Sequence, residues 1–176
     1  MCWGLKGMLI REMTELDIEN IKNVATLTWK DTYSSFIPKE IQKKVLNEAY
    51  SKEEMNNRLT SSLSLVAEEN NEILGYAFFS GDLTLEEVFL ESLYVNPNHQ
   101  GKGVGKQLIV TGLSKYTEPT SISLTVYKGN PNISFYERQG FSVVKEIQGD
   151  FFKHPVVFLL MKKNVVSNPS GLSKNI

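Results

Sequence analysis

Residues 95–106 read Val-Asn-Pro-Asn-His-Gln-Gly-Lys-Gly-Val-Gly-Lys, and this stretch decides the fold class. It joins an apolar run that predicts a strand over residues 85–95 to apolar side chains at helical spacing, which predict a helix. Glycines let the backbone approach a ligand closely, and free N–H groups at a helix N-terminus bind phosphate. A flexible glycine linker is the alternative. The position between a strand and a helix favours a phosphate-binding turn.

This turn does not match the two common nucleotide-binding signatures. A Walker loop requires a leading glycine where Gln100 stands, and Ser or Thr where Gln107 stands. A dinucleotide fingerprint requires Gly-x-Gly-x-x-Gly, whereas Gly101, Gly103 and Gly105 occupy alternate positions. The sequence therefore predicts a phosphate-binding turn that belongs to neither of these two nucleotide-binding classes.

The segments on both sides of the turn predict a mixed sheet. Capping patterns and apolar periodicity predict several helices. The first ends near residue 33, others begin at residues 38 and 51, another begins in the glycine turn, and the last spans residues 133–138. Strands are predicted at 9–13, 63–68, 73–80, 85–95, 121–127, 141–145 and 156–162. This order predicts one α/β domain (mixed α+β), whose sheet has helices on both faces.

Composition narrows the classes of function. The chain has 176 residues and a formal net charge of −1, which gives no basic surface for nucleic acid. The single cysteine, Cys2, excludes an internal disulfide framework, and His99 and His154 lack the spacing of metal ligands. No apolar run approaches the roughly 20 residues that span a bilayer. We therefore expect a cytoplasmic protein with no metal, no nucleic-acid partner and no membrane partner.

The two ends differ from the rest of the chain. Residues 1–7 are too short and mixed for a signal peptide, and are expected to be a leader outside the fold. Residues 164–176 are rich in Ser, Asn, Pro and Gly and are expected to form a flexible tail. The domain is accordingly predicted over residues 8–163.

Two motifs resemble the GNAT superfamily of N-acetyltransferases. The first is Gln100-Gly101-Lys102-Gly103-Val104-Gly105, similar to the family's Gln/Arg-x-x-Gly-x-Gly/Ala signature. The second is the run 130–141, which resembles Asn-x-x-Ala-x-x-Phe-Tyr-x-x-x-Gly-Phe, although Asn130 stands one residue closer to the tyrosine than usual. The resemblance implies a mostly antiparallel sheet of about seven strands, a splay between strands 4 and 5, and acetyl-CoA as cosubstrate.

The resemblance also implies which residues bind acetyl-CoA. Main-chain groups of one strand segment would pair with the pantetheine arm, and an amide there would polarise the thioester carbonyl. The Asn130 side chain would hold the cofactor, and a plain helix cap is its alternative role. The backbone amides of the turn would cradle the pyrophosphate. The implied strand residues are Leu93, Tyr94 and Val95, and the implied turn residues are Gln100, Gly101, Lys102, Gly103, Val104, Gly105 and Lys106.

Two residues are implied as catalytic. Tyr136 matches the family's general acid, which protonates the departing thiolate, and a core tyrosine is the alternative. Glu91 lies near the position of a carboxylate that often acts as base through water; a solvated strand carboxylate is equally compatible. Alternation along the strand places Glu91 on the face of Leu93 and Val95, unless a bulge reverses it.

Four other polar residues bear on the acceptor side. His99 is expected at the surface, His154 at the border of the acceptor cleft, and Asp31 and Asp150 as groups that attract a cationic amine.

The predicted reaction is direct acetyl transfer from acetyl-CoA to the primary amine of a small molecule. The run from Trp29 through Tyr33 to Pro38 resembles bacterial members that acetylate polyamines or other small amines, although Trp and Tyr at helical spacing are also typical of a core. A protein or peptide N-acetyltransferase and a non-catalytic acyl-CoA-binding sensor are the alternatives. A homodimer is common in the family and is possible here.

Overall fold

The computed structural model describes residues 7–166, and its first third is mostly helical. A short strand and a 3₁₀ turn lead into α1, whose buried face carries Ile21, Ala25 and Trp29. Pro38 precedes α2, and the Ser51 hydroxyl accepts a hydrogen bond from Glu54 N at 3.3 Å, which caps α3. The elements are β1 (Leu9–Glu12), η1 (Glu15–Asp17), α1 (Ile18–Tyr33), α2 (Lys39–Ala49) and α3 (Lys52–Ser61).

One seven-stranded sheet runs through the molecule in the order β1-β2-β3-β4-β5-β7-β6. All neighbouring strands are antiparallel except β4 and β5, which are parallel. The predicted mixed, mostly antiparallel sheet is therefore confirmed. The remaining elements are β2 (Ser62–Glu69), β3 (Glu72–Ser80), β4 (Glu87–Val95), η2 (Pro97–His99), α4 (Val104–Leu113), β5 (Ser121–Tyr127), α5 (Ile133–Arg138), β6 (Ser142–Phe151) and β7 (His154–Asn164).

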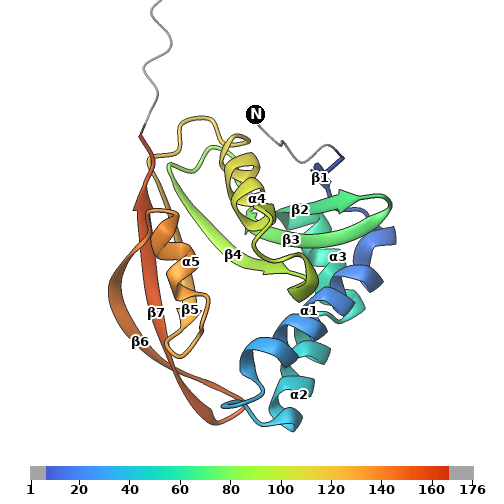
Figure 1. Ribbon diagram of the computed structural model, residues 1–176. Helices are drawn as coiled ribbons and strands as arrows, with labels where there is room; N and C mark the ends of the chain where they lie inside the picture. Colours follow the sequence, from blue (N-terminus) through green and yellow to red (C-terminus); the bar gives the residue numbers. More distant parts are fainter. Residues whose placement is uncertain (1–6, 167–176) are drawn as a thin grey trace, which may run out of the picture.

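Helices cover both faces of the sheet, as predicted (Figure 1). On one face α4 buries Leu108 and Ile109 against the strands, and Phe135 and Tyr136 of α5 pack at the edge of the same cluster. On the other face α1, α2 and α3 form a second cluster with β2 and β3. The strands thus separate an α4 side of the sheet from an α1 side.

The predicted splay between β4 and β5 is present. The two strands pair only through Glu87–Phe89 and Ser121–Ser123. Beyond that point β4 pairs with β3 and β5 pairs with β7, so the two halves of the sheet diverge (Figure 1). The second half of β4 therefore has one edge without a neighbouring strand.

A β-bulge interrupts β4 at Glu91. Phe78 pairs with Ser92 and Phe79 pairs with Leu90, which leaves Glu91 as the extra residue. The bulge reverses the alternation of faces, so Leu90 and Leu93 both pack on the α4 side. Simple alternation, which put Glu91 on the face of Leu93, does not hold. Its carboxylate instead pairs with a side chain of α3.

The last hairpin is longer than its sequence predicts. β6 continues to Phe151 rather than residue 145, and β7 begins at His154 rather than 156. Phe152 and Lys153 form the turn with φ of +48° and +66°. Neither residue is typical of such a turn, and most of β6 is exposed on both faces, so the usual alternation signal is missing. At the other end of β7, Val165 N donates to Thr120 O at 2.8 Å.

Residues 1–6 of the expected leader and residues 167–176 of the expected tail lie outside the described part of the chain. No helix within residues 7–166 is both long enough and apolar enough to cross a membrane.

Candidate active site

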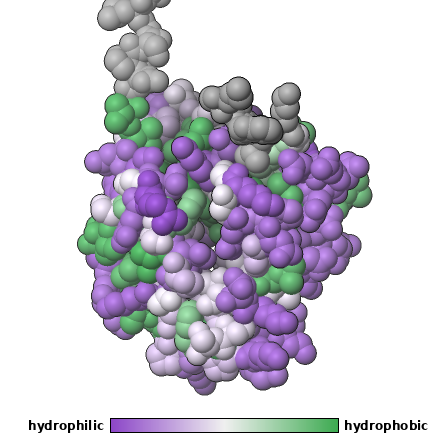
Figure 2. Space-filling model, viewed as in Figure 1, coloured by the Kyte–Doolittle hydropathy of each residue, from purple (hydrophilic) through white to green (hydrophobic). Residues whose placement is uncertain are grey.

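A cavity of about 550 Å³ lies at the splay. Figure 2 shows a hollow near the middle of a mostly hydrophilic face, between the part that carries α5, β6 and β7 and the part that carries α1 to α4. The walls come from α1, β4, the glycine turn, β5, α5 and the β6–β7 hairpin. Every residue that the sequence marked for catalysis or cofactor binding lines this cavity, except Lys102.

The glycine turn brings a free helix N-terminus to the cavity. Gly101 and Gly103 have φ of +76° and +80°, a left-handed conformation that favours glycine. Gly103 is the N-cap of α4, and no side chain caps the helix there. The first N–H groups of an α-helix have no partner within the helix, so those of α4 are free to bind an anion.

Gly105 has a different role from the other two glycines. A Cβ added to it would lie 3.0 Å from Cζ of Phe135, so glycine lets α4 and α5 pack closely. At Gly101, by contrast, an added Cβ would meet no atom within 4 Å. Sequence reasoning treated the three glycines alike, because the packing partner of Gly105 lies 30 residues away in the chain.

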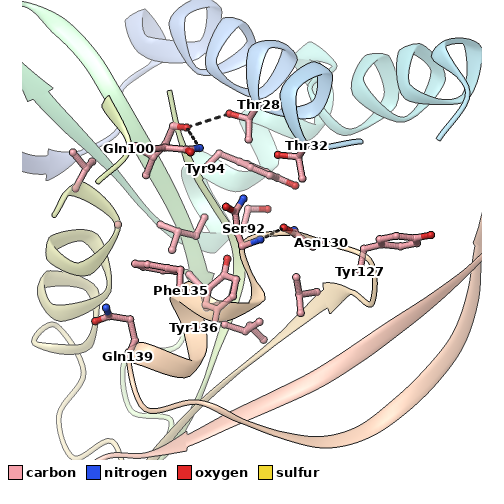
Figure 3. A pocket seen from close by; sticks show the side chains of 18 of the residues that line it. Thr28, Thr32, Ser92, Tyr94, Gln100, Tyr127, Asn130, Phe135, Tyr136 and Gln139 are labelled. Carbon is pink, nitrogen blue, oxygen red and sulfur yellow. Dashed lines mark hydrogen bonds between the residues drawn. The ribbon is translucent and has the colours of Figure 1, made fainter. Parts of the chain in front are cut away.

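Along the free edge of β4, every second residue directs its main-chain N–H and C=O toward the cavity. Asn96 N donates to Leu74 O at 2.8 Å, which shows which alternate residues of β4 direct their main-chain groups toward β3. N–H and C=O of one residue point to the same side of an antiparallel strand, so those of Leu93 and Val95 point into the splay and those of Tyr94 point to β3. Val95 O accepts from Thr28 Oγ1 and from Gln100 Nε2, each at 3.4 Å (Figure 3).

Tyr94 reaches the cavity through its side chain instead. Its hydroxyl accepts a hydrogen bond from Trp29 Nε1 at 3.2 Å, on the α1 side of the sheet. Burial raises the pKa of Tyr94 above its ordinary value, so this hydroxyl stays protonated. The predicted main-chain role therefore fits Leu93 and Val95 and does not fit Tyr94.

Tyr136 projects from α5 into the cavity (Figure 3). Its ring packs edge-on against Phe135 at 5.2 Å and Phe141 at 5.9 Å between centroids. Burial raises its pKa, and nearby Tyr94 raises it further. Within residues 7–166 no hydrogen bond engages the Tyr136 hydroxyl, which leaves a protonated phenol free to act on a ligand.

Both ends of the Asn130 amide have protein partners. Oδ1 accepts from Asn132 N at 2.8 Å, which closes a turn before α5, and Nδ2 donates to the Tyr33 hydroxyl at 3.2 Å. The helix N-cap itself is Asn132. Asn130 thus ties the β5–α5 turn to α1, a role close to the structural alternative that the sequence left open.

Glu91 is held by an arginine that the sequence analysis missed. Arg58 Nη1 of α3 lies 2.7 Å from Glu91 Oε2, and the guanidinium carbon lies 4.5 Å from the ring centroid of Phe78. The two paired side chains are 24% and 35% exposed. No sequence signal links residues 33 positions apart on a helix and a bulged strand.

Three of the four other acceptor-side residues lie outside the cavity, and the fourth, His99, lines it. Asp31, Asp150 and His154 do not line the cavity, and Asp150 Oδ1 accepts from Lys153 N at 2.9 Å in the hairpin turn. His99 does line it, and its Nε2 lies 3.1 Å from Glu72 Oε1. Within the described part of the chain, Glu91 is the one carboxylate in the cavity wall.

Aromatic side chains form the wall on the α1 side. Trp29 contacts Tyr33 at 4.7 Å and Phe151 at 5.7 Å between centroids, and Phe151 meets Phe158 edge-on at 5.5 Å. The sequence pointed to Trp29 and Tyr33 but not to the two phenylalanines. Phe151 fell in a segment between two predicted strands, so its approach to α1 had no sequence signal.

Comparisons with known proteins agree with this geometry. A model of the acetyltransferase (GNAT) family matches residues 22–141. The spermidine N(1)-acetyltransferase of Thermoplasma acidophilum is 27% identical over 151 residues, covering 81% of this chain and 92% of that protein. The N-acetyltransferase YuaI of Bacillus subtilis is 25% identical over 133 residues, covering 73% and 76% respectively.

A solved structure shows the same likeness in three dimensions. The PaiA N-acetyltransferase of Thermoplasma acidophilum, crystallised with coenzyme A, matches with a TM-score of 0.77 and 25% identity, covering 90% of this chain and 99% of that chain. The family model spans more than half of this sequence, and the chain therefore belongs to the GNAT family of acetyltransferases. It is an N-acetyltransferase that uses acetyl-CoA.

Proposed function

We propose that this enzyme transfers the acetyl group of acetyl-CoA to the primary amine of a small molecule, with both substrates bound in the splay. One observation carries this proposal: a single cavity opens on a free helix N-terminus and a free strand edge on the α4 side, and on an aromatic wall on the α1 side. Such a cavity suits two ligands that meet at the sheet from opposite faces.

The residues present fit acetyl-CoA. The free N–H groups at the start of α4 suit its pyrophosphate, and Lys106 of the same turn adds a positive charge in the wall. The main-chain groups of Leu93 and Val95 suit the amides of the pantetheine arm, as an added strand would. Lys102 does not line the cavity, so its part in binding is limited to attraction from outside.

The side chains around the splay suit direct transfer. Acetyl-CoA supplies an activated acyl group and a thiolate leaving group. In the proposed step the amine nitrogen attacks the thioester carbonyl carbon, a C–N bond forms and the C–S bond breaks. Tyr136 gives its proton to the sulfur, and the proton lost by the amine passes to Glu91, directly or through water. The N–H of Leu93 or Val95 supports the carbonyl oxygen.

The α1 side supports a small acceptor rather than a peptide. Phe151 at the end of β6 contacts Trp29 of α1, so the hairpin narrows the cavity on this side, where a peptide would need an open groove. The relative named for spermidine acetylation supports the same choice of acceptor. A non-catalytic acyl-CoA sensor is the second candidate, and the free hydroxyl of Tyr136 in the cavity argues against it.

Acetyl-CoA binding is tested first by thermal unfolding. Ligand at 100 times its dissociation constant stabilises the folded state by about 2.7 kcal/mol. For a domain of this size each kcal/mol raises Tm by about 2–4 °C, so we expect a rise of about 5–10 °C. Free pantetheine, which lacks the pyrophosphate, is the control and should give a much smaller rise. Equal shifts would contradict the role given to the α4 N-terminus.

A further inference from the structure

The charges in the cavity wall do not match a polycation. The charged side chains that line it are Glu91, Lys106 and Arg138, with His99 beside them. Lys106 and Arg138 lie on α4 and α5, which leaves Glu91 for the acceptor, and that carboxylate is already paired with Arg58. A buried ammonium is costly unless it is paired, so the second and third charges of a polyamine would find no partner here.

The acceptor wall is instead a box of rings. Trp29 and Tyr33 come from α1, Phe151 from β6, and Phe158 from β7, and all four line the cavity. Gly149 lies on β6 beside Phe158, and a Cβ there would approach Cε2 of that ring to 2.9 Å. Glycine therefore makes room for Phe158 in the box.

We infer that the acceptor is a primary amine carried on an apolar, preferably aromatic, body, and that this enzyme prefers such an amine to a polyamine. The apolar body fills the space between α1 and the β6–β7 hairpin. Its amine then points toward Glu91 and Tyr136. This inference rests on the proposed function and specifies the acceptor class for the same site.

The box also helps the chemistry. An amine with a pKa of about 10.4 is almost fully protonated at pH 7, whereas only the neutral form attacks a carbonyl carbon. An apolar environment disfavours the ammonium form and so lowers its pKa. An aromatic ring still attracts a cation that comes to lie over its face. A single amine on an apolar body benefits from both effects, whereas a polyamine keeps its other charges.

The test compares 2-phenylethylamine with spermidine. Thiol release with saturating acetyl-CoA gives kcat/KM for each amine, and we expect 2-phenylethylamine to be preferred at least about tenfold, the effect of one or two well-placed apolar contacts. Calorimetry with CoA present gives amine binding independently of turnover. Equal values, or a preference for spermidine, would overturn the inference while leaving the proposed function intact.

The two failures are distinguishable. If 2-phenylethylamine binds beside CoA more tightly than spermidine but no thiol is released, the acceptor inference stands and the transfer reaction is wrong. If neither amine binds and neither is acetylated, both are wrong.

Substitutions test whether the aromatic box causes the preference for 2-phenylethylamine over spermidine. Phe151→Ala should lower the ratio of kcat/KM for 2-phenylethylamine over spermidine by about tenfold. Phe152→Ala is the matched control, because Phe152 is the next residue, is 45% exposed and does not line the cavity. Phe151→Glu places a carboxylate in the box and should move the ratio further toward spermidine. Unchanged ratios in both Phe151 variants would overturn the inference.

Discussion

Arg58 Nη1 and Glu91 Oε2 lie 2.7 Å apart, which ties α3 to the bulge of β4. The guanidinium also lies over the Phe78 ring, so it is fixed from two directions. Its Nε is buried without a hydrogen-bond partner, and the charge is satisfied through the ion pair. The pair engages Oε2 and leaves Oε1 of Glu91 without a hydrogen bond to Arg58, so Oε1 is the oxygen that would take the amine proton in the proposed step.

Glu91→Gln tests the proposed base. The amide keeps the shape of the side chain but cannot take a proton, so kcat/KM should fall by about 100-fold, the lower range for general base catalysis. Glu87→Gln is the matched control on the same strand. Glu87 pairs with Lys162 at 3.0 Å and does not line the cavity, so its loss should leave turnover unchanged. Equal rates for the two variants would show that Glu91 is not the base.

Tyr136→Phe tests the proposed acid. Because no described residue bonds to its hydroxyl, the variant should fold normally, bind acetyl-CoA with nearly unchanged affinity, and lose about 10–100-fold in kcat. Burial raises the Tyr136 pKa above the usual value of about 10, so wild-type kcat should not fall from loss of this proton between pH 7 and 9.5.

Tyr116→Phe is the control for this tyrosine. The Tyr116 hydroxyl bonds to Ser80 O, so its removal should lower the free energy of unfolding without a specific loss of turnover. If Tyr136→Phe instead loses acetyl-CoA binding or stability, the role of this tyrosine is structural.

Two glycine substitutions separate binding from chemistry. Gly101→Ala forces a left-handed φ on alanine in the phosphate turn and should weaken acetyl-CoA binding more than it lowers kcat. Gly105→Ala presses on Phe135, the neighbour of Tyr136, and should lower kcat by about tenfold through misplacement. Titration calorimetry and single-turnover rates measure the two effects. The same pattern for both variants would contradict the distinct roles given to these glycines.

Acid stability depends on Asp17. Its carboxylate accepts hydrogen bonds from both terminal nitrogens of Arg11 at 2.8 Å and from Thr14 N at 2.8 Å. The Arg11 hydrogen bonds lower the Asp17 pKa in the folded state. The resulting stability is present above the unfolded pKa of about 3.9 and is lost as the pH falls through the lower folded value.

Asp17→Asn should therefore cost about 2 kcal/mol of unfolding free energy at pH 7. The difference from wild type should shrink when urea unfolding is repeated at pH 3. Glu15→Gln is the control and should change little, because Glu15 lies in the same 3₁₀ turn but is exposed, whereas Asp17 is buried. A difference that stays constant with pH would show that the ionised form of Asp17 does not stabilise the fold.

Much of the fold was predictable because its signals are local. The glycine turn, the Ser51 cap and the alternating strands identify their own elements, and the run 130–141 contains Tyr136, which projects into the cavity. The longer β6 was missed because an exposed strand has no alternation. Its turn at Phe152 and Lys153 also lacks the usual residues.

The acceptor side was less predictable because its contacts are between distant residues. Arg58 reaches Glu91 only because a bulge turns that residue to the α1 side. Phe151 reaches Trp29 only because the hairpin extends back to α1. Neither approach leaves a pattern in one sequence, whereas the cofactor side is built from contiguous motifs.

The central claim is that this chain transfers an acetyl group to a small primary amine. The most direct measurement is a stoichiometric one: purified protein, acetyl-CoA and 2-phenylethylamine or spermidine, with free thiol and acetylated amine quantified together. The account predicts one thiol released for each N-acetylated amine formed, with many turnovers per protein molecule. A rise in Tm with acetyl-CoA but no acetylated amine from either acceptor would contradict it.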